Sequence, residues 1–75
     1  MVAVAFCESS LDPNANRRDV DVGLFQINQV HIPTLQSLGL DRYDMEDNLA
    51  YARILYNQNG LRDWYMSYNC WSRFK

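Results

Sequence analysis

Two short stretches decide what this chain is, Cys7-Glu8-Ser9-Ser10 and Asp21-Val22-Gly23-Leu24-Phe25-Gln26-Ile27-Asn28. The first puts a glutamate at the end of an apolar segment. The second combines a carboxylate, a glycine and two amides with large apolar residues. Each stretch is a weak signal alone, and both gain meaning from a downstream segment, Asn48-Leu49-Ala50-Tyr51-Ala52-Arg53.

Length and composition bound the possibilities. A chain of 75 residues, 48 % hydrophobic and 13 % aromatic, is expected to fold, and it forms one domain at most. Its core is marginal, because a domain of this size buries only about 60 % of its unfolded surface. We expect a single minimal domain over residues 1–75. The first helix lacks an N-cap at Met1, which suggests a domain cut from a longer protein or a minimal natural version.

Charge and hydropathy disfavour several partners. The net charge is −2 and the basic residues are scattered, so no nucleic-acid partner is expected. No apolar run is long enough for a membrane span, and residues 1–6 are too few for a signal-peptide core. The sequence predicts no cofactor and no metal site. The acidic residues Asp41, Asp44, Glu46 and Asp47 lack the spacing of a calcium loop, and a helix start explains them.

The two cysteines, Cys7 and Cys70, lie near opposite ends of the chain. A disulfide between them would stabilise the fold by about 4 kcal/mol on the chain-entropy model, and it would indicate an exported or cell-surface protein. The alternative is two buried free thiols in a reducing compartment. A catalytic cysteine is not expected, because the single histidine, His31, has no obvious partner.

The pattern of turn and apolar residues predicts a mainly α domain with at most a short β-hairpin. The expected elements are a helix over 2–11, a loop over 12–22 that permits a short strand, a helix between Pro33 and Gly39, a helix over 45–58 and a final helix over 62–72. Val4, Phe6 and Leu11 are expected to face inward in part. Pro13 and Gly60 end the first and the long helix.

The helix over 45–58 carries an apolar face. Met45, Leu49, Ala52 and Tyr56 are spaced as one continuous stripe, and Asn48 shares a second stripe with Leu55. Asp44 is expected to be its N-cap. Asn48 is therefore a candidate for a side chain that points into a groove.

Glu8 is the candidate general acid. Cleaving a glycosidic bond requires a carboxyl group that stays protonated near neutral pH, and burial among apolar groups gives a glutamate that property. Glu8 follows the apolar segment 2–7, which a disulfide at Cys7 would attach to the aromatic C-terminus. The alternative is a solvated surface glutamate.

Asp21 is the candidate second carboxylate. Retaining glycosidases place two carboxyl groups about 5–5.5 Å apart, one as the acid and one as nucleophile or charge stabiliser. The alternative is an aspartate that bonds its own loop backbone. Gly23 permits a backbone angle or a close approach that other residues do not allow. In an extended stretch, Gln26 and Asn28 would share a face and offer amides to sugar groups; the alternative is that they cap the backbone.

Aromatic residues are plentiful in the second half of the chain. Six of them are candidates for stacking on pyranose rings: Tyr51, Tyr56, Trp64, Tyr65, Tyr68 and Trp71. Aromatic residues at helical spacing more often belong to the core. We expect most of the six to be core and one or two to contact sugar.

These motifs resemble a known family. Residues 7–16, residues 21–28 and the segment 31–40 (His-Ile-Pro-Thr-Leu, then Leu-Gly-Leu) are similar to the transglycosylase domain of the soluble lytic transglycosylase type. They are closest to its small members that accompany secretion and conjugation machines. In that family the Glu-Ser pair carries the catalytic acid and a Gly-Leu-Met-Gln motif lines the cleft, with Phe25 here in place of the methionine. A third motif corresponds to Asn48, Ala52 and Tyr56.

The chain also resembles animal-type lysozymes, which share a Glu-Ser pair and an Asp-Tyr-Gly-Ile-(Leu/Phe)-Gln-Ile-Asn run. Their second carboxylate corresponds to Asp21, with Val22 in place of the tyrosine. Both resemblances imply an α+β lysozyme-like fold. The chain departs from both in lacking the residues that usually precede the catalytic helix. Its acidic balance also differs from the basic lysozymes.

The resemblance implies a secreted or periplasmic muramidase that cuts the β-1,4 bond between N-acetylmuramic acid and N-acetylglucosamine in peptidoglycan strands. The favoured reaction is lytic transglycosylation with Glu8, and the alternative is hydrolysis with Glu8 and Asp21. Substrate contacts are expected from Ser9, Gln26, Asn28, Asn48 and Tyr56. The expected state is a monomer or a domain of a larger cell-wall or secretion-associated protein. A non-catalytic glycan-binding or structural module is the remaining alternative.

Overall fold

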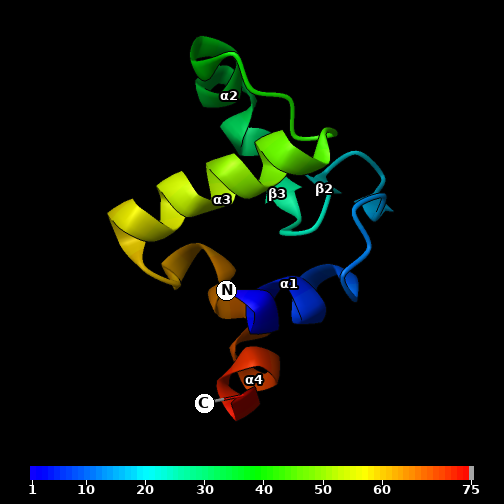
Figure 1. Ribbon diagram of the computed structural model, residues 1–75, viewed down its shortest axis with the longest axis vertical. Coiled ribbons are helices and arrows are strands. Elements are labelled where there is room, and N and C mark those ends of the chain that lie inside the picture. The colour runs from blue at the N-terminus through cyan, green and yellow to red at the C-terminus, as the bar shows by residue number, and fades with distance from the viewer. Residues whose placement is uncertain (75) are drawn as a thin grey trace.

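Helices and three very short strands follow one another in the computed structural model, which describes residues 1–74. Helix α3 (Met45–Asn59) crosses the middle of the molecule. Helix α2 (Ile32–Leu38) lies at one end, and α1 (Val2–Ser9) and α4 (Tyr68–Trp71) lie at the other (Figure 1). This arrangement confirms a mainly α domain with a small β part. None of the described helices is long and apolar enough to cross a bilayer.

Helix α1 ends two residues earlier than the sequence pattern predicts. Ser10 and Leu11 have φ angles of 55° and 63°, a left-handed turn that stops the helix before the proline does. Val4 is buried as expected. The prediction was wrong for Phe6 and Leu11, which are 48 % and 50 % exposed. Phe6 lies two positions from Val4 and so on the other side of the helix, and the left-handed turn takes Leu11 off the inner face.

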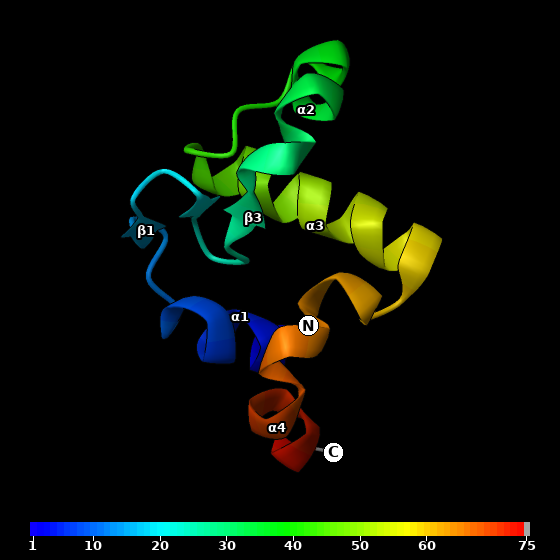
Figure 2. The same ribbon diagram turned by 180° about the vertical axis from the view of Figure 1, so that it is seen from behind.

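The β part is a three-stranded antiparallel sheet in the order β1-β2-β3, one strand more than a single hairpin. Its strands are β1 (Asn16–Arg17), β2 (Asp21–Val22) and β3 (Ile27–Asn28). Asp21 is the central residue of this register, because it pairs with Arg17 on one side and with Asn28 on the other. The register therefore places Arg17, Asp21 and Asn28 next to one another, on a sheet that a hydrogen bond from Asn48 joins to α3 (Figure 2).

Helices α2 and α3 follow their sequence signals closely. Pro33 lies in the first turn of α2, and Gly39 ends it in a left-handed conformation with φ 71°. The Asp44 carboxylate accepts a hydrogen bond from the Asp47 amide at the start of α3, and Gly60 ends that helix. Both predicted helices are confirmed, α3 to within one residue.

The buried face of α3 differs from the predicted one. It consists of Asn48, Tyr51, Ala52 and Leu55. The stripe through Met45, Leu49 and Tyr56 was wrong, because these side chains are 51 %, 46 % and 44 % exposed. The true face has the i, i+3, i+4, i+7 spacing, but two of its four members are polar or carry a hydroxyl, so hydrophobicity alone does not reveal it.

Residues 62–74 form three short helical pieces rather than the single predicted helix. A 3₁₀ segment, η2 (Arg62–Ser67), precedes α4, and η3 (Ser72–Phe74) follows it. Trp64 has a non-helical backbone (φ −113°, ψ 17°). Its indole is 3 % exposed and donates a hydrogen bond to the Phe25 carbonyl at 3.0 Å. The break thus turns Trp64 into the core.

A disulfide joins α1 to α4. Cys7 and Cys70, which are 63 residues apart in sequence, are bonded with a Cα–Cα separation of 5.9 Å. The disulfide alternative is therefore correct and the free-thiol alternative is not. Because Glu8 follows Cys7, the bond also fixes the helix that carries the candidate acid.

Candidate active site

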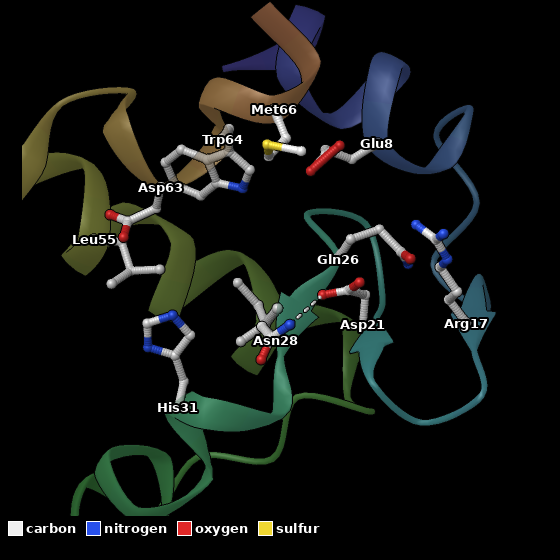
Figure 3. Close-up of a pocket in the computed structure, with 11 residues that line it drawn as sticks. Glu8, Arg17, Asp21, Gln26, Asn28, His31, Leu55, Asp63, Trp64 and Met66 are labelled. Carbon is white, nitrogen blue, oxygen red and sulfur yellow. Dashed lines mark hydrogen bonds between the residues drawn. The ribbon is translucent and has the colours of Figure 1, made fainter.

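A pocket of about 430 Å³ opens between α1, the sheet, α3 and η2. Its walls mix carboxylates, amides and apolar groups (Figure 3). The lining residues are Glu8, Arg17, Asp21, Gln26, Ile27, Asn28, His31, Leu55, Asp63, Trp64 and Met66. Four of the seven predicted catalytic or substrate-binding residues lie among them, namely Glu8, Asp21, Gln26 and Asn28.

Glu8 lies in the last turn of α1 and is partly buried. Burial raises the pKa of its carboxyl group above the ordinary value of 4.5, and the negative charge of Asp21 acts in the same direction. The hydroxyl of Ser67 opposes both by hydrogen bonding to the charged form. Since burial has the largest effect, Glu8 keeps its proton to a higher pH than a solvated glutamate.

Asp21 faces Glu8 from the opposite wall of the pocket (Figure 3). Its Oδ1 accepts a hydrogen bond from the Asn28 amide at 3.1 Å across the β2–β3 pair. Asn28 uses its other amide atom to accept the Val30 backbone N–H at 2.9 Å. The sheet therefore orients Asp21 through a neighbour whose own side chain is fixed at both ends.

Gln26 occupies the tight turn between β2 and β3, where its φ angle is 48°. Its amide nitrogen donates to the carbonyl oxygens of Gly23 at 2.9 Å and Ala15 at 3.2 Å. These bonds tie the turn to the loop before β1. The donors of Gln26 thus cap the backbone, as one of the two alternatives predicts, while the side chain still lines the pocket.

Gly23 and Asn48 are in close contact at the turn between β2 and β3. Asn48 is fully buried, and its amide accepts from the Phe25 N–H and donates to the Val22 and Arg42 carbonyls. A Cβ atom on Gly23, whose φ is 85°, would lie 2.2 Å from the Asn48 amide nitrogen. Only glycine fits this close approach. Asn48 therefore holds the β2–β3 turn, and we assign it a scaffolding role rather than the expected contact with sugar.

Arg42, which the sequence pattern did not single out, supports the same sheet from the α2–α3 connection. Its guanidinium is 5 % exposed and donates to the carbonyl oxygens of Val20 at 2.8 Å, Ile27 at 2.9 Å and Asp19. The planar fork of arginine suits several carbonyl acceptors at once. Arg42 lies among polar residues in the segment between α2 and α3, and this sequence pattern does not indicate that its side chain is buried.

Two other residues expected to contact substrate also lie outside the pocket lining. The Ser9 hydroxyl bonds the Ala5 carbonyl at 3.0 Å and the Leu24 carbonyl at 2.8 Å, so it joins α1 to the β2–β3 turn. Tyr56 is 44 % exposed on α3. The Ser9 hydrogen bonds position the helix that carries Glu8. Tyr56 lies on the exposed side of α3.

Several pocket residues were not predicted. Arg17 and Asp63 are exposed, and Met66 is 99 % exposed. The sequence signal that could have indicated Arg17 is the pair of turn-forming residues around it, Asn16 and Asp19. In the structure these two residues hydrogen-bond each other, and the turn between them places Arg17 opposite Asp21. His31, for which the sequence shows no obvious partner, has its Nδ1 2.9 Å from the Tyr51 hydroxyl.

The aromatic residues divide between core and surface. Tyr51 and Trp64 are buried and Trp71 is half-buried, so these three belong to the core or its edge. Tyr56, Tyr65 and Tyr68 are exposed. Of the six, only Trp64 lines the pocket, which places its ring at the site even though its indole N–H is used internally.

This arrangement suits acid catalysis, with a carboxylate on the opposite wall of the pocket. Glu8 supplies a carboxyl group with a raised pKa, and Asp21 supplies a second carboxyl group across the cavity. Among residues 1–74, no three His, Cys, Asp or Glu side chains are grouped so that they could hold a metal ion.

A family model described as a lysozyme-like domain matches residues 1–66, which is most of the chain. No curated protein matches the chain, and no solved structure does so either.

Proposed function

Because the chain belongs to the lysozyme-like domain family, we propose that it cleaves the β-1,4 bond between N-acetylmuramic acid and N-acetylglucosamine in peptidoglycan. One observation carries this proposal. Glu8 lies in a pocket that also contains the carboxyl groups of Asp21 and Asp63 and the amides of Gln26 and Asn28, and burial raises its pKa. A glycosidase needs such a protonated carboxyl group beside the scissile bond.

In the first step Glu8 donates its proton to the glycosidic oxygen, and the bond from that oxygen to C1 of the muramyl residue breaks. The electron pair leaves with N-acetylglucosamine, which departs as an alcohol. The muramyl residue becomes a sugar cation, and Glu8 becomes a carboxylate. Asp21, on the opposite wall, stabilises the positive charge that develops at C1.

In the second step the Glu8 carboxylate acts as a base. It takes the proton of the muramyl C6 hydroxyl while that oxygen bonds to C1, which gives a 1,6-anhydro end and restores the protonated acid. One carboxyl group serves both steps. We therefore favour a lytic transglycosylase, in agreement with the resemblance of the His31–Leu40 segment to that branch.

A lysozyme-type hydrolase is the second candidate. The observation that favours it is the position of Asp21, which lines the same pocket as Glu8 and is oriented by Asn28. In this reaction Asp21 stabilises or captures the sugar cation, and Glu8 takes a proton from water, which then adds to C1. Both reactions begin with proton donation by Glu8. They differ in the oxygen that finally adds to C1, which is the muramyl C6 hydroxyl in the transglycosylase and water in the hydrolase.

The proposed substrate is the glycan strand of the cell wall, which implies action outside the cytoplasm, in the periplasm, at the cell surface or after secretion. The disulfide between Cys7 and Cys70 supports this location, because such bonds persist in oxidising compartments. A monomer, or a domain of a larger cell-wall or secretion-associated protein, fits this role.

The test is mass spectrometry of the fragments that the protein releases from purified peptidoglycan, with Glu8→Gln as the control. We expect fragments ending in 1,6-anhydromuramic acid, and a release rate for Glu8→Gln that is lower by about 10²- to 10⁴-fold. Reducing ends, heavier by one water, would establish the hydrolase instead. Equal release by both proteins would contradict the role of Glu8, and no release would favour a binding or structural module.

A further inference from the structure

His31 lies at the end of the pocket remote from Glu8 (Figure 3), and its side chain pairs with that of Tyr51. The Nδ1 atom of His31 lies 2.9 Å from the Tyr51 hydroxyl oxygen. The two rings pack edge to face, with centroids 5.3 Å apart. The imidazole is therefore fixed by one hydrogen bond and one ring contact, although it lies on a short 3₁₀ segment, η1 (Gln29–His31).

The direction of this hydrogen bond depends on the tautomer of His31. Tyr51 is 2 % exposed on the inner face of α3, and burial raises its pKa, so the hydroxyl keeps its proton. A hydrogen bond from Thr34 to the Tyr51 oxygen acts on the pKa in the opposite direction. A tyrosine that keeps its proton can donate it to His31 Nδ1. An imidazole that accepts at Nδ1 carries its own proton on Nε2.

His31 is more accessible than the polar side chains that are buried in the scaffold. The polar side chains that only hold the fold, Asn48 and Arg42, are 0 % and 5 % exposed and do not line the pocket. His31 differs from them, because it is partly exposed and forms part of the pocket wall. Its second nitrogen is thus the polar atom that remains for a ligand.

We propose that His31 is a specificity-determining residue of the pocket, with a neutral imidazole that donates a hydrogen bond from Nε2–H to a hydroxyl or carbonyl oxygen of the bound glycan. Tyr51 is its positioning residue: it holds the tautomer and the ring orientation without touching substrate. The identity of the ligand rests on the proposed function, whereas the tautomer does not.

The tautomer is read directly by long-range ¹H–¹⁵N NMR, since His31 is the only histidine in the chain. For the neutral imidazole we expect an unprotonated Nδ1 and a protonated Nε2. Tyr51→Phe should move the spectrum toward a mixture of tautomers. Tyr43→Phe is the matched control, because it also removes a hydroxyl with a side-chain hydrogen bond, at 2.6 Å to Asp19, but lies outside the pocket. A protonated Nδ1, or no change in Tyr51→Phe, would overturn the role of Tyr51.

Ligand binding is measured in a Glu8→Gln background, so that cleavage does not interfere. The probe is a peptidoglycan-derived tetrasaccharide of N-acetylglucosamine and N-acetylmuramic acid. We expect its addition to shift the Nε2 signal, and His31→Ala to weaken its affinity about tenfold, the usual effect of one lost hydrogen bond. His31→Gln, whose amide also donates, should recover part of the loss. Folding of each variant is confirmed by its NMR spectrum.

The outcomes separate this inference from the proposed function. Cleavage of peptidoglycan with unchanged tetrasaccharide affinity in His31→Ala would overturn the inference alone. A tenfold loss of affinity in a protein that cleaves nothing would support the inference and contradict the proposed reaction. Absence of tetrasaccharide binding would contradict both.

Discussion

At the scale of single residues, the account depends on Glu8 and its surroundings. The pKa of Glu8 is raised by burial, so the native state holds a proton at pH values where the unfolded chain has lost it. The free energy of unfolding therefore contains a contribution that is present below the unfolded pKa and is lost as the pH rises through the folded pKa. In the proposed reaction, the same ionisation removes the acid form of Glu8.

The first prediction concerns Glu8→Gln, which cannot ionise. As the pH rises above about 4.5, its free energy of unfolding should increase relative to that of the wild type, while activity is lost by about 10²- to 10⁴-fold. Urea denaturation at a series of pH values measures the first effect, and a peptidoglycan release assay measures the second. Parallel stability curves for the two proteins would show that burial does not affect this carboxyl group.

The second prediction concerns Gly23→Ala. The added Cβ would displace the Asn48 amide and break its three backbone hydrogen bonds, so we expect a loss of about 3 kcal/mol or more. Gly39→Ala is the matched control: its φ is also positive, but a Cβ there meets no atom within 4 Å. It should cost only about 1 kcal/mol, for backbone strain. Equal losses of unfolding free energy in the two variants, measured by chemical denaturation, would contradict the role of the close contact between Gly23 and Asn48.

At the scale of elements, the sheet is held from outside. Its strands have two residues each, too few to be stable alone. The Arg42 guanidinium donates to the carbonyl oxygen of Val20, just before β2, and to that of Ile27, in β3. We predict that Arg42→Lys lowers stability by about 2 kcal/mol, because a lysine cannot satisfy all of these acceptors. Arg53→Lys, on the exposed side of α3, is the control and should change stability by less than about 0.5 kcal/mol. Similar melting curves for the two variants would contradict this.

The elements also show how far sequence reasoning reaches. Helices α2 and α3 were predicted well, because Pro33, Gly39, Asp44 and Gly60 are local signals that act without help from the rest of the chain. The inner face of α3 was not, because Asn48 and Tyr51 are buried by partners that are distant in sequence, Gly23 and His31. Of the pocket lining, the sequence predicted the motif residues Glu8, Asp21, Gln26 and Asn28, and it named Trp64 among the aromatic candidates.

At the scale of the whole molecule, the Cys7–Cys70 bond closes most of the chain around a small core. We predict that replacing both cysteines by serine costs about 4 kcal/mol, a large part of the stability of a domain this size. Thermal unfolding of the wild type with and without a reductant provides the same comparison. Activity should fall with the folded fraction, because Glu8 is next to the bond. An unchanged melting temperature on reduction would contradict this view.

The central physical claim is that this fold raises the pKa of the Glu8 carboxyl group, and a site-resolved NMR titration of the Glu8 carboxyl carbon tests it most directly. The measurement needs neither substrate nor activity. The account predicts a midpoint above the ordinary value of 4.5 that moves lower when Asp21 is replaced by Asn, since the Asp21 charge contributes to the shift. A midpoint at or below 4.5 would remove the physical basis for Glu8 as the acid.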